Sequence, residues 1–268
     1  MADGERGTAV ELLTTATARD EQERRARGPA IAVLPVGSFE QHGDHLPLIT
    51  DTVVACLIAS RLSERYRLFL LPPVTISCSQ EHEGFAGAVS LSARTLYAVV
   101  DDVYRSLRRN GMERLVVVNG HGGNYVLQNV VQEANVDGPR VALFPTSPDW
   151  DTARRAAGLE APPGNDMHAG ELETSLLLHA RPELVGERYA ERDWIAPTWR
   201  THLLVTGMRG YTPSGVIGRP SLATPAKGKA LLDSLVASFA EHLEVLAQGN
   251  GAVPPPGRTA VPTGQDGD

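Results

Sequence analysis

The 268-residue sequence has few cysteines and aromatic residues, no long apolar run and no excess of basic residues. Its two cysteines, Cys56 and Cys78, are too few for a disulfide-stabilised scaffold. Since the N-terminus also lacks the charged-then-apolar pattern of a secretion signal, we expect a cytoplasmic protein. The longest apolar runs fall far short of the ~20 residues that span a membrane. The net charge of -7, without any Lys/Arg-rich run, argues against nucleic acid as a partner.

The composition along the chain divides it into a central domain and two polar ends. Residues 1–28 are rich in Glu, Arg and Thr and predict an N-terminal arm, as a marginal helix or without order. Residues 249–268 are rich in Gly and Pro and predict a disordered tail. The 42% of apolar residues supports a sizeable core for one domain over 29–248.

Short apolar runs alternate with amphipathic segments through this domain. We expect strands at 30–36, 68–76, 115–118 and 141–144. We expect helices at 51–65, 92–110, 124–134, 169–178 and from the Thr224-Pro225 pair to about residue 246. This alternation predicts a three-layer, doubly wound α/β fold with a mostly parallel sheet. Ligands of such folds bind beyond the carboxyl ends of the strands.

Polar clusters occur at or near those positions, at 35–51, 119–124 and 166–174. Glu40 and His42 are two residues apart, so an extended backbone would point both side chains the same way. Asp51 begins a predicted helix, and His121 follows the third strand. Carboxylates mixed with imidazoles suit Zn²⁺, Mn²⁺ or Fe²⁺, and two such ions can activate a shared water. We therefore expect a metal-dependent hydrolase.

Each of these residues also has a structural interpretation. A single Glu40 or His42 could be a satisfied buried group, and His45 and His82 are expected to be structural or to support the site. The Gly122-Gly123 pair before a helix could hold a phosphate, and Cys78 could be a nucleophile. His179, His202 and His242 are expected at the surface or in packing. The joint occurrence of the clusters favours the metal site.

The segments 34–52, 119–124 and 168–175, in this order, resemble the creatininase (creatinine amidohydrolase) family over roughly residues 30–247. The resemblance implies an α/β fold, often a homohexamer, with two divalent metal ions per subunit that hydrolyses a C–N amide bond. By position, Glu40, His42, Asp51 and His121 match metal ligands of the family, with Asp51 bridging. His168 matches a histidine that carries protons during catalysis.

The sequence departs from the creatinine-hydrolysing members at Gly123, where they carry a glutamate ligand. Glu173 or Glu171 could supply the missing carboxylate, and we favour Glu173 because the Glu-Thr-Ser element recurs in the family. Because the two glutamates are two positions apart, they cannot face the same way on a helix. His168 and Glu171 are expected to act in catalysis. Substrate contacts are expected from the residues of the neighbouring loops, Ser79, Gly122 and Asn124.

The substrate is expected to be a small cyclic amide, a formamide or a short peptide. Gly122 and residues 164–167 stand where creatinine hydrolases carry aromatic side chains, so a creatinine-sized clamp is missing. Residues 84–87, 214–218 and 223–224 resemble the branch associated with mycofactocin maturation, which removes a C-terminal dipeptide from a precursor peptide. Another branch deformylates a pyrimidine intermediate. A catalytically silent binding protein and a nucleotide-binding protein are the alternatives from other functional classes.

Overall fold

The sheet has four parallel strands. In the computed structural model, which describes residues 14–28 and 30–248, these are β1 (Ile31–Val36), β2 (Phe69–Leu70), β3 (Arg114–Asn119) and β4 (Val141–Phe144). They lie in the order β2-β1-β3-β4, and every neighbouring pair is parallel. All six residues of β1 are buried, as expected for a strand covered on both faces. The α/β fold with a parallel sheet is confirmed.

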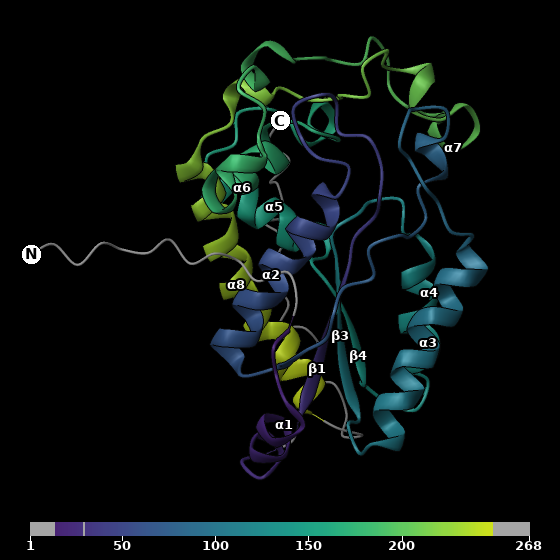
Figure 1. Cartoon of the computed structure of the whole chain (residues 1–268), viewed down its shortest axis with the longest axis vertical. Coiled ribbons are helices and arrows are strands. Elements are labelled where there is room, and N and C mark those ends of the chain that lie inside the picture. The colour runs from purple at the N-terminus through teal and green to yellow at the C-terminus, as the bar shows by residue number, and fades with distance from the viewer. Residues whose placement is uncertain (1–13, 29, 249–268) are drawn as a thin grey trace, which may run out of the picture.

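Helices cover both faces of this sheet (Figure 1). One face carries α2 (Thr50–Tyr66), α5 (Ser147–Ala156), α6 (Glu171–Ala180) and α8 (Pro225–Ala247), and the other carries α3 (Ala93–Arg109) and α4 (Val126–Ala134). Thr224 caps α8 and Ser92 caps α3 through their side chains, as the sequence predicts. Each face encloses its own apolar cluster, so the molecule has three layers.

The structure differs from the sequence prediction at one strand and one helix. The expected strand over 68–76 is reduced to Phe69–Leu70, because Pro72 and Pro73 cannot donate to a ladder. Helix α5 was not expected, although Thr146 and Asp149 form a capping box at its start. In the N-terminal arm, the described part contains only the short helix α1 (Ala18–Arg25). Residues 1–13 and the tail predicted over 249–268 lie outside the described residues.

The loops beyond the carboxyl ends of the strands contain the remaining short elements. These are α7 (Leu203–Thr206) and the 3₁₀ turns Gln80–His82, Pro163–Asn165, Pro182–Leu184, Tyr189–Glu191, Met208–Gly210 and Pro220–Leu222. None of the helices in the described part of the chain is long and apolar enough to cross a membrane.

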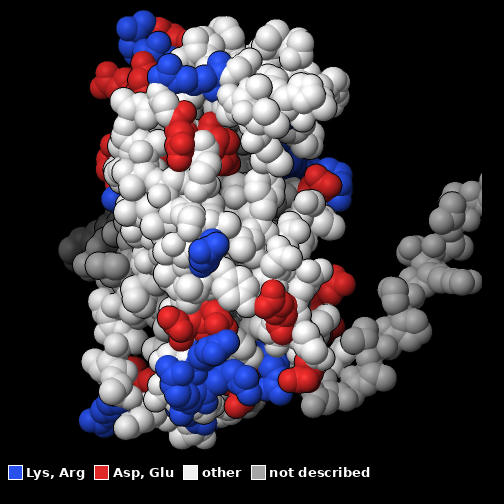
Figure 2. All heavy atoms as spheres, turned by 90° about the vertical axis from the view of Figure 1, so that its right-hand side faces the viewer, with Lys and Arg blue, Asp and Glu red and all other residues white. Residues whose placement is uncertain are grey.

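The face covered by α3 and α4 carries charges of both signs (Figure 2). Lys and Arg side chains gather at its lower end, beside Asp and Glu. Ion pairs link the two signs where α3 ends: Arg105 pairs with Asp101, and Arg108 and Arg140 both approach Glu113. These three arginines are therefore balanced by neighbouring acids.

Candidate metal centre

Two glycines allow the loops after β1 and β3 to approach the start of α2 closely. A Cβ atom at Gly37 would lie 2.4 Å from the backbone of Thr52, and one at Gly120 would lie 2.2 Å from the carbonyl oxygen of Asp51. Any larger residue would push these loops off the helix. The close approach brings Glu40, His42 and His121 to the carboxylate of Asp51.

Asp51 lies at the centre of the cluster, almost completely buried in the first turn of α2. Its Oδ1 atom is 3.0 Å from Nε2 of His42, and its Oδ2 atom is 2.9 Å from Nδ1 of His121. The Ser38 hydroxyl donates a further hydrogen bond to Oδ2. Because its two oxygens face different histidines, Asp51 has the geometry of a bridging ligand.

Glu40 is fully buried, yet neither of its carboxylate oxygens has a hydrogen-bond partner of good geometry. Imidazole nitrogens surround it: Nε2 of His82 at 3.1 Å, Nδ1 of His121 at 3.3 Å and Nδ1 of His168 at 3.7 Å from its Oε1 atom. Burial raises the pKa of the Glu40 carboxyl to about 8. A buried carboxylate without partners is costly unless a cation neutralises it.

Glu173 completes the other side of the cluster from the first turn of α6. Its Oε2 atom accepts a hydrogen bond of 2.6 Å from the backbone N–H of Ala169, and its Oε1 atom lies 4.0 Å from Nε2 of His42. Ala169 has a φ of 53°, which is uncommon for a residue with a side chain. This backbone conformation aims the Ala169 N–H at Glu173 and leaves the other oxygen facing the cluster.

The histidines of the cluster have oxygen atoms next to their outer nitrogens. Nδ1 of His42 lies 3.1 Å from the carbonyl oxygen of Glu40 and donates to it, which turns Nε2 toward Asp51. Nε2 of His121 lies 3.4 Å from Oε1 of Glu81, and its Nδ1 faces Asp51. Metal-binding histidines typically donate their outer N–H to a carbonyl or carboxylate in this way.

His168 stacks between two other histidines, 4.2 Å from the ring of His42 and 4.4 Å from that of His82. Its Nε2 atom lies 2.6 Å from the carbonyl oxygen of Gln41 and donates to it, so the lone pair is on Nδ1, toward Glu40. Burial and the neighbouring imidazoles hold the pKa of His168 well below its usual range. His168 is therefore a neutral base directed at the cluster.

In the described part of the chain, three groups of ligand atoms are close enough to hold a metal ion: Glu40, Asp51 and His121; His42, Asp51 and Glu173; and Glu40, His42 and His168. The first two share only Asp51 and together use all five predicted ligands. Buried carboxylates and imidazoles are the donors that Zn²⁺ and Mn²⁺ take. The orphaned oxygens of Glu40 and the orientation of His42 and His121 fit such ions.

Glu171 is not part of this cluster, contrary to the role expected for it. It is fully buried, and its carboxylate accepts hydrogen bonds from the backbone N–H groups of Glu160 and Ala161 and from Nζ of Lys227 at 2.6 Å. On α6 it points away from Glu173, as the helical spacing requires. Its carboxylate has no free lone pair directed at the site, so its position indicates a structural role.

Of the residues expected to contact substrate, the structure brings only Gly122 to a cavity. Gly122 is exposed, with no atom within 4 Å of a Cβ placed on it. Asn124 is buried and bonds to Gly37, Asn119 and Cys78, which ties the loops together. Ser79 is fully buried and belongs to neither cavity described below.

The surroundings of Cys78, His45 and His82 indicate what each of these residues does in the structure. Cys78 is buried in the apolar cluster under α3, and burial raises the pKa of its thiol, which opposes nucleophilic use. His45 bonds to the carbonyl oxygen of Ala169, and burial lowers its pKa to about 4. His82 approaches Glu40 and lines the larger cavity, so it supports the site.

Two cavities flank the cluster. One of about 610 Å³ is lined by residues of 81–82, 121–125 and 199–203 among others, and one of about 410 Å³ by residues of 145–154 and 163–173 among others. They share a wall made of His121, Gly122, Met167, His168 and Glu173. The cluster therefore lies between two adjoining cavities.

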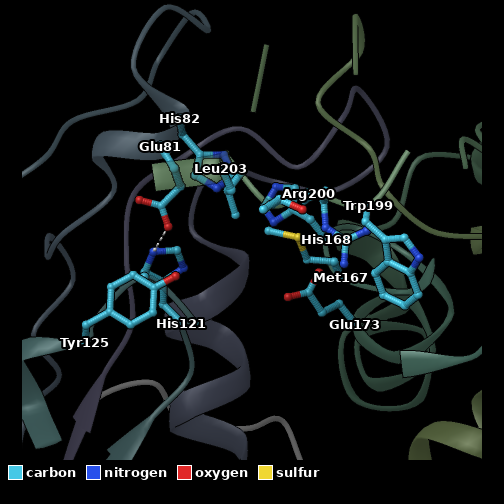
Figure 3. Close-up of a pocket in the computed structure, with 13 residues that line it drawn as sticks. Glu81, His82, His121, Tyr125, Met167, His168, Glu173, Trp199, Arg200 and Leu203 are labelled. Carbon is cyan, nitrogen blue, oxygen red and sulfur yellow. Dashed lines mark ion pairs between the residues drawn. The ribbon is translucent and has the colours of Figure 1, made fainter. Parts of the chain in front are cut away.

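The larger cavity includes residues that the sequence did not single out (Figure 3). Glu81 and Tyr125 lie on the side of His121, whereas Trp199 and Arg200 lie on the side of His168 and Glu173. Trp199 also contacts the site of a Cβ at Gly164, at 3.2 Å. Aromatic side chains are thus present at the site, from positions other than those of the creatinine hydrolases. Trp199 lies in a loop without a motif, and Tyr125, although it directly follows the 119–124 cluster, has no spacing that would reveal its place at the cavity.

A model of the creatininase family, described as creatinine amidohydrolase, matches residues 14–243. The chain belongs to the creatininase family. The mycofactocin precursor peptide peptidase of Mycobacterium ulcerans (strain Agy99) is 35% identical over 218 residues, which cover 76% of this chain and 80% of that protein. The creatinine amidohydrolase of Pseudomonas putida is 28% identical over 245 residues, covering 85% and 94%.

Among solved structures, one described as "Creatininase Mn" superposes with a TM-score of 0.73 at 25% identity, covering 86% of this chain and 96% of that one. The fold, the family match and the geometry of the ligand cluster all indicate a metal-dependent hydrolase. This member of the creatininase family is a metal-dependent hydrolase whose candidate ligands are those that the sequence motifs contain.

Proposed function

We propose that the protein is an amidohydrolase with two divalent metal ions per subunit. Glu40, Asp51 and His121 would hold the first ion, and His42, Asp51 and Glu173 the second. The observation that carries the proposal is the pair of ligand groups that share Asp51 at the wall between two cavities. The oxygen and nitrogen donors favour manganese or zinc, with iron as a further possibility for the same set.

The chemistry follows from the groups around this centre. Two divalent ions, when bound, lower the pKa of a water molecule and polarise the carbonyl of an amide. His168 would accept a proton from that water at Nδ1 and deliver it to the departing nitrogen as the C–N bond breaks. Its Nε2–H stays bonded to the carbonyl of Gln41, which keeps the imidazole oriented through the exchange.

We further infer that the substrate is an extended amide, such as a short peptide, rather than a compact ring. Cavities of about 610 and 410 Å³ on either side of the centre can accept groups on both sides of the scissile bond. The similarity to the mycofactocin precursor peptide peptidases supports a peptide. Creatinine and formamides are alternative substrates for the same amide hydrolysis. Because the chain is similar to a creatinine amidohydrolase, the substrate screen includes them.

The test combines metal analysis with a substrate screen. We expect about two Mn²⁺ or Zn²⁺ ions per chain after reloading of chelated protein, and metal-dependent hydrolysis of short peptides in preference to creatinine. Glu40→Gln and His121→Ala should each lower kcat/KM by at least about a hundredfold, a loss typical of removing essential catalytic groups. Glu83→Ala, at an exposed position near the site, is the matched control and should retain activity. Less than one ion per chain, with turnover intact in both variants, would refute the proposal.

We also propose that the chain forms a homohexamer in the cytoplasm. Strongly exposed apolar side chains near the larger cavity support an assembly: Trp199, Leu204 and Val205 are 80%, 76% and 85% exposed. The thiols of Cys56 and Cys78 are both buried and not joined in a disulfide, which suits a reducing compartment. Light scattering of the metal-loaded protein tests the assembly, and a monomeric mass would refute it.

A further inference from the structure

Among the residues that the structure describes, Arg200 is the only lysine or arginine that lines the larger cavity. Within residues 14–28 and 30–248, no Asp or Glu forms an ion pair with its guanidinium, and its side chain has no hydrogen bond there. It is half-buried, and burial lowers the pKa of its guanidinium. A partly desolvated cation without a partner is a binding site for an anion.

The other arginine at the centre is already engaged. Arg154 lines the smaller cavity, but it donates to Asp166 at 2.9 Å and to the carbonyl oxygen of Ala161 at 2.6 Å. Arg192, nearby in sequence to Arg200, pairs with Asp44 at 2.8 Å. Arg200 therefore differs from its neighbours in having its donors available to a ligand.

The charges around the larger cavity determine whether the Arg200 guanidinium leaves it with a net positive charge. Glu40, Asp51, Glu173 and Glu81 are all within or beside the ligand cluster. Two divalent cations would balance these carboxylates. Arg200 then gives the larger cavity a net positive charge, on the side of the cavity where His168 and Glu173 lie (Figure 3).

We propose that Arg200 binds a carboxylate group of the amide substrate and thereby selects amides that carry a free carboxylate. This inference rests on the proposed amidohydrolase function and adds the substrate class to it. The planar guanidinium offers two parallel N–H donors that match the two oxygens of a carboxylate. Anchored in this way, the substrate is held in the larger cavity with its amide extending toward the metal centre.

Hydroxamic acids, which chelate divalent metals, provide probes that need no known substrate. We suggest the monohydroxamates of malonic, succinic, glutaric and adipic acid, each paired with the compound in which a primary amide replaces the free carboxylate. Their affinities for the manganese-loaded protein are measured by calorimetry. The series varies the separation between the chelating group and the carboxylate, so the best length reports the distance to Arg200.

We expect the neutral compounds to bind, and the acid of one preferred length to bind about tenfold to a hundredfold more tightly than its amide. Arg200→Gln should remove this preference while leaving the affinity for neutral hydroxamates and the metal content unchanged. Arg200→Lys should retain part of it, because the charge remains without the planar fork. Arg94→Gln is the matched control: Arg94 is exposed and lines neither cavity.

Two outcomes would overturn the assignment while leaving the metal centre intact: equal affinity for acids and amides at every length, or a preference for acids that survives in Arg200→Gln. If the protein takes up no metal and binds none of the hydroxamates, the proposed function itself fails, and the substrate class fails with it. Binding of the neutral hydroxamates therefore distinguishes a wrong assignment of Arg200 from a wrong assignment of the metal centre.

Discussion

At the scale of single residues, the most informative position is Gly123. A Cβ atom there would lie 2.1 Å from Oε1 of Glu81 and 2.4 Å from Nε2 of His121. The space beside His121 is therefore occupied by the Glu81 carboxylate, whose side chain is only 10% exposed. We infer that Glu81 holds the His121 ring in place and keeps the proton on its outer nitrogen.

Removing this carboxylate should weaken the metal centre without changing its ligands. Glu81→Ala is expected to lower metal affinity by about tenfold to a hundredfold, the usual effect of removing a carboxylate behind a ligating histidine. Competition with a chromogenic chelator measures this directly. Glu83→Ala is the control, since Glu83 is exposed and two residues away. Gly123→Glu should lower metal affinity even in the Glu81→Ala background, because a Cβ at position 123 would still lie 2.4 Å from Nε2 of His121. Unchanged affinity in Glu81→Ala would contradict the role.

The candidate ligands could be proposed from the sequence more readily than the residues around them. Glu40, His42, Asp51 and His121 could be found because they follow strand ends in compact motifs. Glu81, Trp199 and Arg200 could not, because tertiary packing alone brings their loops to the cavity. Helical spacing separated Glu171 from Glu173, but only the position of Lys227 indicates which of them faces away.

At the scale of secondary-structure elements, the position of Glu173 depends on the contact between α6 and α8. A Cβ at Gly228 of α8 would lie 1.9 Å from the carbonyl oxygen of Ser175, so glycine permits the two helices to touch. Lys227, next to it, donates to the buried Glu171 carboxylate. The ion pair between Lys227 and Glu171 therefore holds α6, which carries the candidate ligand Glu173, against α8.

We expect Lys227→Met to destabilise the protein by about 3 kcal/mol, because it leaves the buried Glu171 charge without its cation. Lys229→Met is the matched control on the same helix. Lys229 is 64% exposed and pairs with Asp233, which is 42% exposed, so its loss should change the unfolding free energy by less than about 1 kcal/mol. Urea unfolding of the two metal-free variants provides the comparison. Equal stabilities would show that the Glu171 contact is dispensable.

The elements that the sequence predicted well are those whose pattern is local. The limits of α2, α3 and α8 follow from apolar spacing and caps, and differ from the predicted ranges by at most one residue at either end. The strand over 68–76 was too long because its apolar run continues through two prolines. Helix α5 was missed because Ser147, Pro148 and Asp149 resemble a turn.

At the scale of the whole molecule, the metal centre joins distant parts of the chain. Its candidate ligands come from the loop after β1, the start of α2, the loop after β3 and the start of α6. Metal binding to the native state alone should therefore stabilise the complete fold. At a metal concentration a hundred times Kd the gain is about 2.7 kcal/mol, which for a domain of this size raises Tm by roughly 5 to 10 °C.

Glu40→Gln separates this gain from the stability of the metal-free fold. In wild type, the Glu40 carboxyl is fully buried and burial raises its pKa to about 8, so its ionised form is disfavoured until a metal cation arrives. The amide of glutamine cannot ionise and has nearly the same volume. We expect the chelated variant to melt no lower than chelated wild type, whereas added Mn²⁺ should raise its Tm far less. Calorimetry of both proteins with and without metal tests this, and an equal rise in Tm on metal addition would exclude Glu40 as a ligand. Both expectations follow from one cause: burial disfavours the ionised form of the Glu40 carboxyl until a metal cation is bound.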